Sequence, residues 1–321
     1  MAGEGNMENK RKISSLISEY FIFIIFIVLV AILAIMKPSF IGPRNLTNIM
    51  KQASINGILA FGMMFVIISG AFDMSVGSTL AFSGILAALL GKGQVPLIVP
   101  MFVAMLAGLC VGILNGIGIA YGDLPPFIMT LGTQTAVRGL ALLACGGNPV
   151  TGLSENYRAL AAGKILGIPT IAVFTIVVII ICSFVANKTV YGRRVYSCGG
   201  NLQAANVSGI NTNFIRVSTF AIAGLLAGLC GFLMTSRVTI GQPTAGESYE
   251  MDAITACVVG GVSMSGGVGK PLGVVIGTLL ITVIANGLDI LGVSAYWQKI
   301  IKGIIIVAAV LIDVKRKRNK A

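Results

Sequence analysis

The sequence predicts an all-α fold, a polytopic bundle of about ten transmembrane helices with both termini in the cytoplasm. Two observations carry this prediction. First, 56% of the residues are hydrophobic and only 11% are charged, against about 25% charged residues in a typical soluble domain. Second, the apolar residues form continuous blocks, the first of which is 20–36. Such blocks are typical of membrane-spanning helices, whereas membrane barrels require short alternating strands.

Ten apolar blocks divide the chain. The predicted spans are residues 20–36, 53–71, 76–91, 96–120, 125–145, 168–187, 217–236, 251–267, 271–289 and 297–313. We expect residues 1–19 to form a cytoplasmic N-terminal tail, residues 20–313 the transmembrane domain and residues 314–321 a basic cytoplasmic tail. The first block is interpreted as a retained span, because no small-x-small cleavage site of a signal peptide stands at its end.

The basic residues predict the orientation. An even number of spans places both termini on one side, and Lys and Arg are more frequent in the segments that this topology assigns to the cytoplasm. The weak point is the first outside segment, where Lys37, Arg44 and Lys51 run against this rule. The net charge of +12 is therefore attributed to membrane topology and not to nucleic-acid binding, because the basic residues gather at the ends of spans.

Residue content excludes several kinds of chemistry. Histidine is absent, which removes the commonest general base and metal ligand. The six cysteines lie far apart and form no C-x-x-C pair. A glycine-rich stretch ends in Gly269 and Lys270, but Pro271 stands where a phosphate-binding loop needs Ser or Thr. We therefore predict no catalytic residue, no metal site and no cofactor bound by this chain.

Neutral polar side chains inside apolar blocks are the candidates for a solute path. Burying them in lipid is costly, so they must face the bundle interior or a cavity. The tentative path residues are Asn115, Thr130, Gln134 and Asn286, whose donor and acceptor groups suit an uncharged, hydroxylated solute. The alternative for each is an interhelical hydrogen bond that serves packing. The acidic residues lie near predicted span ends, where we expect them to cap helices or contact water.

Residues 188–216 form a predicted cytoplasmic loop with a candidate docking element. Gly199 and Gly200 predict a turn, Asn201 is a favourable N-cap, and the following LQAANVS predicts a short helix that Gly209 ends. A short helix presented in a cytoplasmic loop is suited to docking against a partner protein. The alternative is a surface turn that only connects two spans.

The glycines show two patterns. Gly108, Gly112 and Gly116 recur every four residues, a spacing that lets helix backbones approach closely, and we interpret it as packing within the bundle. Residues 70–77 and 260–267 share Gly, Met, Ser and Gly at matching offsets. This match indicates an internal duplication with broken helices.

Seven segments spread over residues 38–313 carry a resemblance to a known family. They are NLTNIM (45–50), SGAFDMSVGS (69–78), PPFIMTLGT (125–133), VRGLALL (137–143), GGNLQAANVSGIN (199–211), GQPTAGESYEMDAITACVVGG (241–261) and GVSAYWQKIIKG (292–303). In sequence, order and spacing they resemble the permease subunits of ribose-type and galactose-type bacterial ABC importers. Ala71, Phe72 and Met74 depart from that family's usual residues, which leaves the sugar open.

The resemblance implies transport without covalent chemistry. Permeases of this family form a two-subunit channel in the bacterial inner or plasma membrane. They receive substrate from a periplasmic or surface sugar-binding protein and are driven by a separate ABC-type ATPase, which uses the ATP. The resemblance thus implies a multi-pass homodimer that imports a monosaccharide, ribose first and galactose or another sugar next. The residues that it assigns to coupling with the ATPase are Asn201, Ala204, Ala205, Ser208, Gly209 and Ile210.

Two further expectations follow. If the short helix docks in a cleft of the ATPase, Ala204 and Ala205 are small because the helix must approach closely, and an arginine at position 205 should leave the membrane bundle folded. The alternative function, from another class, is an ion-coupled secondary carrier or channel for a small polar solute. The absence of neighbouring genes for an ATPase and a binding protein would favour that alternative.

Overall fold

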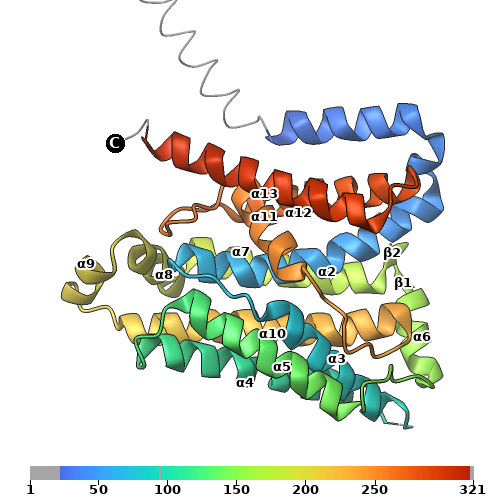
Figure 1. The fold of residues 1–321 in the computed structure, drawn as a ribbon, viewed down its shortest axis with the longest axis horizontal. Coiled ribbons are helices and arrows are strands. Elements are labelled where there is room, and N and C mark those ends of the chain that lie inside the picture. Colours follow the sequence, from blue (N-terminus) through green and yellow to red (C-terminus); the bar gives the residue numbers. More distant parts are fainter. Residues whose placement is uncertain (1–21, 94, 319–321) are drawn as a thin grey trace, which may run out of the picture.

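The computed structural model describes residues 22–318 except residue 94, so the predicted tail 1–19 and residues 319–321 lie outside the described residues. The chain is almost entirely helical, as predicted (Figure 1). A helix over Ile22–Met36 is followed by η1 (Pro38–Ile41), α2 (Pro43–Ile68), α3 (Val76–Gly91), α4 (Ile98–Ala120), α5 (Pro126–Ala144), α6 (Glu155–Ala162), β1 (Lys164–Ile165), β2 (Ile168–Pro169), α7 (Thr170–Lys188), α8 (Val190–Gly200), α9 (Leu202–Val207), α10 (Thr212–Val238), α11 (Tyr249–Val259), α12 (Pro271–Ile290) and α13 (Ala295–Arg318).

Six of the described helices are long and apolar enough to cross a membrane, namely α2, α4, α5, α7, α10 and α12. Helix 22–36 and α3 are apolar but shorter. At about 1.5 Å per residue, α3 covers about 24 Å of a hydrocarbon core that is about 30 Å thick. The chain is thus a multi-pass, all-α membrane bundle, while the number of complete spans stays a prediction.

The predicted span 251–267 is not a continuous helix. Helix α11 ends at Val259, so at about 1.5 Å per residue it covers only about 16 Å, roughly half of the hydrocarbon core. Gly261, Gly266 and Gly267 have φ angles of 86°, 82° and 72°, which a helix cannot contain. The apolar residues after Val259 therefore belong to a loop, and the hydrophobic block does not correspond to one span.

Helices α2 and α10 lie against each other inside the bundle and run antiparallel. Cys230 Sγ of α10 donates to the carbonyl of Ile55 in α2 at 3.4 Å, and the hydroxyls of Ser69 and Thr219 lie 3.4 Å apart near the other end. Every residue of α2 from position 54 to position 68 is buried. This part of α2 is therefore surrounded by protein and not by lipid.

Helix α4 packs along α10 through its glycines. A Cβ atom on Gly116 would lie 2.6 Å from the Cα of Val217, and one on Gly108 would lie 2.9 Å from the Cα of Gly228. Gly112 faces the α10 backbone in the same way. These separations are shorter than carbon atoms tolerate, so only glycine allows this approach. The interpretation of this glycine pattern as helix packing is confirmed.

Two sets of four helices, α2–α5 and α10–α13, make the same contacts. Helices α2, α3, α4 and α5 of the first set correspond to α10, α11, α12 and α13 of the second. The long first helix of each set packs on the second and third helices of the other set, so α10 contacts α3 and α4, and α2 contacts α11 and α12. Within each set the second helix contacts the two that follow it. Because α2 and α10 run antiparallel, the two sets have opposite directions, as in transporters built from inverted repeats. In this arrangement the break at residues 69–75 corresponds to residues 239–248. The match of 70–77 with 260–267 is wrong as a guide to the duplication.

A small cap between α5 and α7 was not expected from the sequence. Helix α6 is held by Tyr157, whose hydroxyl donates to the carbonyl of Ala87 at 2.7 Å and whose own carbonyl accepts from Ser236 Oγ at 2.7 Å. Strands β1 and β2 follow as a short antiparallel hairpin. The hairpin lies at the opposite end of the bundle from α8 and α9 (Figure 1).

Candidate functional site

The first break, residues 69–75, connects the end of α2 to the start of α3. Gly70 has a φ angle of 88° and turns the chain away from α2. Asp73 is 1% exposed, and its Oδ1 accepts hydrogen bonds from the backbone N–H and the Oγ of Ser75 at 2.8 and 2.6 Å. This side chain holds the turn that starts α3.

Two of the predicted path residues meet at this break. Asn115 of α4 donates from Nδ2 to Ser75 Oγ at 2.8 Å, and Thr130 of α5 accepts from the backbone N–H of Met74 at 3.1 Å. Both are fully buried. The Oδ1 atom of Asn115 is buried with no hydrogen-bond partner among the described residues, so one acceptor at the break stays unpaired.

The other two predicted path residues lie elsewhere. Asn286 of α12 is 2% exposed and exchanges two amide hydrogen bonds with Asn45 of α2, at 2.9 and 3.0 Å. This pair joins two helices, which is the packing alternative considered above. Gln134 is half-buried on α5, four residues after Thr130 and hence on the same helix face. A role in the path stays a prediction for all four residues.

The second break, residues 239–248, is the main feature that the sequence did not predict. Gly241 lies beside Ala88 and Gly246 beside Gly77, so the segment runs back along α3 over about 16 Å of helix length. It therefore enters the bundle to about half the depth of a bilayer core. The signal available in the sequence was the polar run with two glycines and a proline between two apolar blocks.

Arg138 of α5 holds the second break. Its Nη1 atom donates to the carbonyls of Pro243 and Ala245 at 2.6 and 2.9 Å. The carboxylates of Glu247 and Glu250 lie close enough to act on the guanidinium electrostatically. Arg138 lay within one of the resembling segments but was not selected as a path residue, because only neutral polar side chains were selected for the path.

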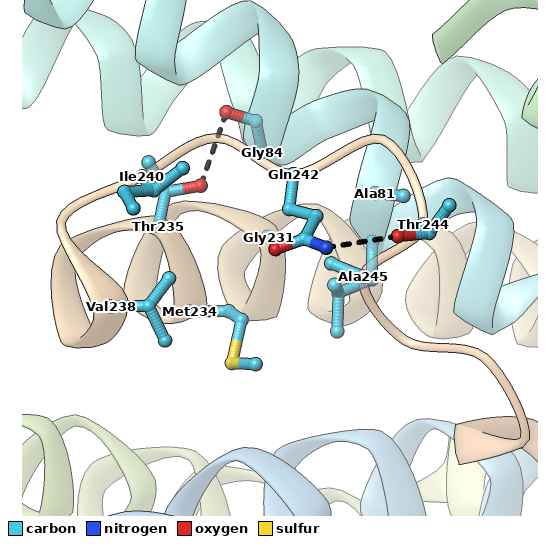
Figure 2. Close-up of a pocket in the computed structure, with 11 residues that line it drawn as sticks. Ala81, Gly84, Gly231, Met234, Thr235, Val238, Ile240, Gln242, Thr244 and Ala245 are labelled. Carbon is cyan, nitrogen blue, oxygen red and sulfur yellow. Dashed lines mark hydrogen bonds between the residues drawn. The ribbon is translucent and has the colours of Figure 1, made fainter. Parts of the chain in front are cut away.

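A cavity of about 230 Å³ lies between α3, α10 and the second break. Figure 2 shows its lining, in which Gln242 Nε2 donates to Thr244 Oγ1 at 3.2 Å and Thr235 Oγ1 donates to the carbonyl of Gly84 at 3.1 Å. The lining combines apolar side chains with a few hydroxyl and amide groups. Such a mixture is typical of pockets that receive small neutral molecules.

The helices that follow the two breaks, α3 and α11, begin close together. Helix α3 starts at Val76 and α11 at Tyr249, and Gly77 and Gly246 touch beside these starts. Both positive ends of the helix dipoles thus lie at the crossing of the breaks, together with amide, hydroxyl and carboxylate groups. This arrangement can form and exchange hydrogen bonds with a passing solute. Among the described residues no cluster of His, Cys, Asp or Glu could hold a metal ion.

An ion pair joins α11 to α13. Lys302 Nζ lies 2.7 Å from Asp252 Oδ2, and Asp252 is 7% exposed. A buried carboxylate needs such a partner to remain charged. The pair therefore fixes the position of α11 relative to α13.

The predicted docking helix is present as α9. Asn201 Oδ1 accepts from the backbone N–H of Ala204 at 2.9 Å, which confirms the predicted N-cap. Ser208 Oγ donates to the carbonyl of Ala204 at 2.8 Å, Gly209 has a φ angle of 79°, and the N–H of Ile210 donates to the carbonyl of Ala205 at 3.1 Å. These contacts end the helix at the predicted glycine.

The exposure of the α9 side chains corrects one expectation. Ala205 is only 4% exposed, because that face of the short helix packs on the rest of this chain. The expectation that arginine at this position leaves the bundle folded assumed that residue 205 lies clear of the bundle, and the burial of Ala205 removes that basis. Val207 is 90% exposed, and Ala204 is also exposed. The face of α9 that a partner can reach carries these two residues.

Helix α8 connects α9 to the bundle. The hydroxyls of Tyr191 and Ser218 lie 2.8 Å apart, and Tyr196 donates to the carbonyl of Gly269 at 2.8 Å. Burial raises the pKa of Tyr191 to about 12, so its phenol stays protonated at neutral pH. Gly199 packs against the backbone at the end of α2. A force on α9 would therefore reach α2 and the loop that follows α11.

These features define a multi-pass membrane transport protein, with two broken helices inside the bundle and the short helix α9 at one end. The chain is not an enzyme. It belongs to the permease family described as "Branched-chain amino acid transport system / permease component", whose model matches residues 45–310, and it is a protein of the bacterial inner membrane.

Several characterised permeases are similar to the chain over most of their length. The ribose import permease protein RbsC of Bacillus subtilis (strain 168) is 45% identical over 88% of each chain. The Haemophilus influenzae protein of the same name is 40% identical over 96% of this chain and 97% of its own. The galactose/methyl galactoside import permease protein MglC of Haemophilus influenzae is 35% identical over 95% and 96%. No solved structure matches the chain.

Proposed function

We propose that this chain is the membrane-spanning permease of an ABC importer for a monosaccharide, with ribose as the first candidate. The observation that carries the proposal is the 45% identity to a ribose import permease over 88% of both chains. Galactose and xylose are the next candidates, because permeases named for them are 35% and 34% identical to this chain.

The chemistry of the second break supports a neutral, hydroxylated solute. Gln242 and Thr244 are exposed there and offer amide and hydroxyl groups. The charged groups are already occupied in part, since Arg138 binds two carbonyls and Asp73 binds Ser75. A branched-chain amino acid, named in the family's description, would instead need a free cation and a free anion along the path.

A separate ATPase is proposed to dock on α9. The exposed Val207 and Ala204 supply its contact surface, and the hydrogen bonds of Tyr191 and Tyr196 connect that surface to α10 and to the loop after α11. Movement of this end can therefore shift the balance between inward-facing and outward-facing states. No ATP-binding loop is needed in this chain for such coupling.

The remaining partners follow from the same proposal. A periplasmic or surface sugar-binding protein delivers the solute at the end that carries α6 and the β1–β2 hairpin, and a second copy of the chain completes the channel. Both termini and α9 then lie in the cytoplasm. Cysteines placed at Val207 and Leu166 test this topology. A membrane-impermeant thiol reagent should reach Val207→Cys only from the cytoplasmic side and Leu166→Cys only from the other side.

A substrate panel tests the proposed class of solute. The permease, its ATPase and its binding protein are reconstituted in vesicles, and uptake of labelled ribose, galactose, xylose and leucine is compared. We expect ribose to be taken up fastest and leucine not at all. If leucine were taken up and none of the three sugars were, the proposal would be overturned. Uptake driven by an ion gradient in the absence of the ATPase would favour the alternative, an ion-coupled carrier or channel.

A further inference from the structure

The second break, residues 239–248, has a polar exposed face within the depth of the bundle. Gly241, Pro243 and Gly246 are buried, whereas Gln242 and Thr244 between them are exposed. Lipid satisfies neither irregular backbone nor polar side chains, so such a segment persists only where it is buried in protein or lines a water-filled cavity. Its exposed face therefore borders water or a second copy of the chain, not lipid.

The two ends of this segment are held differently. At the outer end, Gly241 forms a β-bridge with Val150, with N···O distances of 2.9 and 2.7 Å in the two directions. At the inner end, Ser248 has a φ angle of 66° immediately before α11. This left-handed conformation is unfavourable for a residue other than glycine. Thr239 at the outer end is left-handed as well, with a φ angle of 55°, but the β-bridge with Val150 fixes that end. The junction with α11 is a strained point at which the backbone can change direction.

Between these ends one side chain fixes the backbone. Arg138 donates from a single nitrogen to the carbonyls of Pro243 and Ala245. A planar guanidinium can hold two carbonyls at once, whereas the ammonium of a lysine is a flexible point charge. The conformation of residues 242–247 therefore depends on this contact from α5, together with the hydrogen bond from the N–H of Ala245 to the carbonyl of Gln242 and the contact of Gly246 with Gly77.

Space for movement lies beside the segment. The cavity between α3, α10 and the segment has a volume of about 230 Å³, far more than a single water needs. Figure 2 shows Gln242, Thr244 and Ala245 at its border, facing α3 residues such as Ala81. Gln242 and Thr244 already line this cavity, so if Arg138 released the two carbonyls, the backbone of the segment would have room to move further into it.

We propose that residues 242–247 are a gate on the solute path, and that Arg138 is the positioning residue that latches it in the conformation described here. The proposal rests on the proposed function, since the solute is taken to pass along the exposed face of the segment. In the other state of the transport cycle, the segment leaves Arg138 and moves into the cavity, changing the exposure of its polar side chains.

Thiol accessibility tests the gate in the complete transporter of permease, ATPase and binding protein. Thr244→Cys is placed in a C110S/C145S background, which removes the two cysteines that are not buried. Its reaction rate with a small thiol reagent is measured without nucleotide and after trapping with ATP and vanadate. We expect at least a tenfold difference between the two states. Leu166→Cys is the control, because Leu166 is 98% exposed in the turn between β1 and β2 and does not line the cavity, and its rate should not change.

The latch is tested in the same background. Arg138→Met should bring the two rates at position 244 together, and Arg138→Lys should restore part of the difference because an ammonium can still donate to one carbonyl. If position 244 reacted at the same rate with and without trapped nucleotide, both with Arg138 present and in Arg138→Met, the gate would be overturned. A full difference retained in Arg138→Met would overturn the latch.

Ribose uptake by the same vesicles separates this proposal from the proposed function. State-dependent labelling without ribose uptake would support the gate and count against ribose as the solute. Normal ribose uptake with state-independent labelling would overturn the gate and leave the proposed function standing.

Discussion

The exposed valine on α9 allows docking of the ATPase to be tested quantitatively. Val207 is 90% exposed, so nearly all of its apolar surface is available for burial against a partner. Val207→Ala removes two carbon atoms, and at about 0.8 kcal/mol per buried CH₂ the loss is about 1.6 kcal/mol, or about 15-fold in Kd. Alanine has the higher helix propensity, so the change should not unfold α9 itself.

A matched control lies at the other end of the bundle. Leu166 is 98% exposed in the turn between β1 and β2, far from α9 (Figure 1). Its φ angle of 51° is unusual for a bulky residue. Leu166→Ala removes more apolar surface than Val207→Ala, yet it should leave the affinity for the ATPase unchanged because it lies at the opposite end of the bundle from α9 (Figure 1).

The assay is a titration of purified permease against immobilised ATPase, with each variant first shown to be monodisperse. The expected result is a Kd about 15-fold higher for Val207→Ala and an unchanged Kd for Leu166→Ala. A Kd for Val207→Ala within twofold of the unmodified protein would refute docking through this face of α9. Equal weakening by both variants would show an effect that is not specific to α9.

Two predictions concern stability. Gly108→Ala places a Cβ 2.9 Å from the Cα of Gly228, and such overpacking costs about 1–3 kcal/mol, so Tm should fall. Gly303→Ala meets nothing within 4 Å and should not lower Tm; equal Tm values would contradict the close α4–α10 packing. Lys302→Met leaves Asp252 buried and unpaired, which costs about 3–5 kcal/mol. The double variant Asp252→Asn/Lys302→Met should recover much of that loss, and failure to recover in thermal unfolding would contradict the ion pair.

Much of the fold could be predicted because membrane spans depend on apolar length, which the sequence states directly. Helix α3 has the predicted bounds 76–91, and α4, α7 and α12 differ from the predicted spans by a few residues. The docking helix was predictable for a local reason, since Asn201 and Gly209 act through their own backbone and side-chain geometry. Such signals do not depend on distant parts of the chain.

The second break could not be predicted because it depends on distant contacts. Residues 239–248 are polar and rich in turn-forming residues, as an ordinary surface loop would be. The segment is carried into the bundle by distant contacts, namely those with Arg138, the β-bridge with Val150 and the contact between Gly77 and Gly246. The burial of Ala205 was missed for the same reason, since a six-residue helix shows too little periodicity to reveal its inner face.

The central claim, a permease that imports a monosaccharide at the expense of ATP, is tested most directly by accumulation of labelled ribose. Vesicles carry the permease and its ATPase, with the binding protein and ribose outside and ATP inside. We predict that ribose accumulates above its external concentration only when ATP is present and the ATPase is active, and that dissipating ion gradients has no effect. Accumulation that persists with an inactive ATPase and disappears when ion gradients are dissipated would contradict the account.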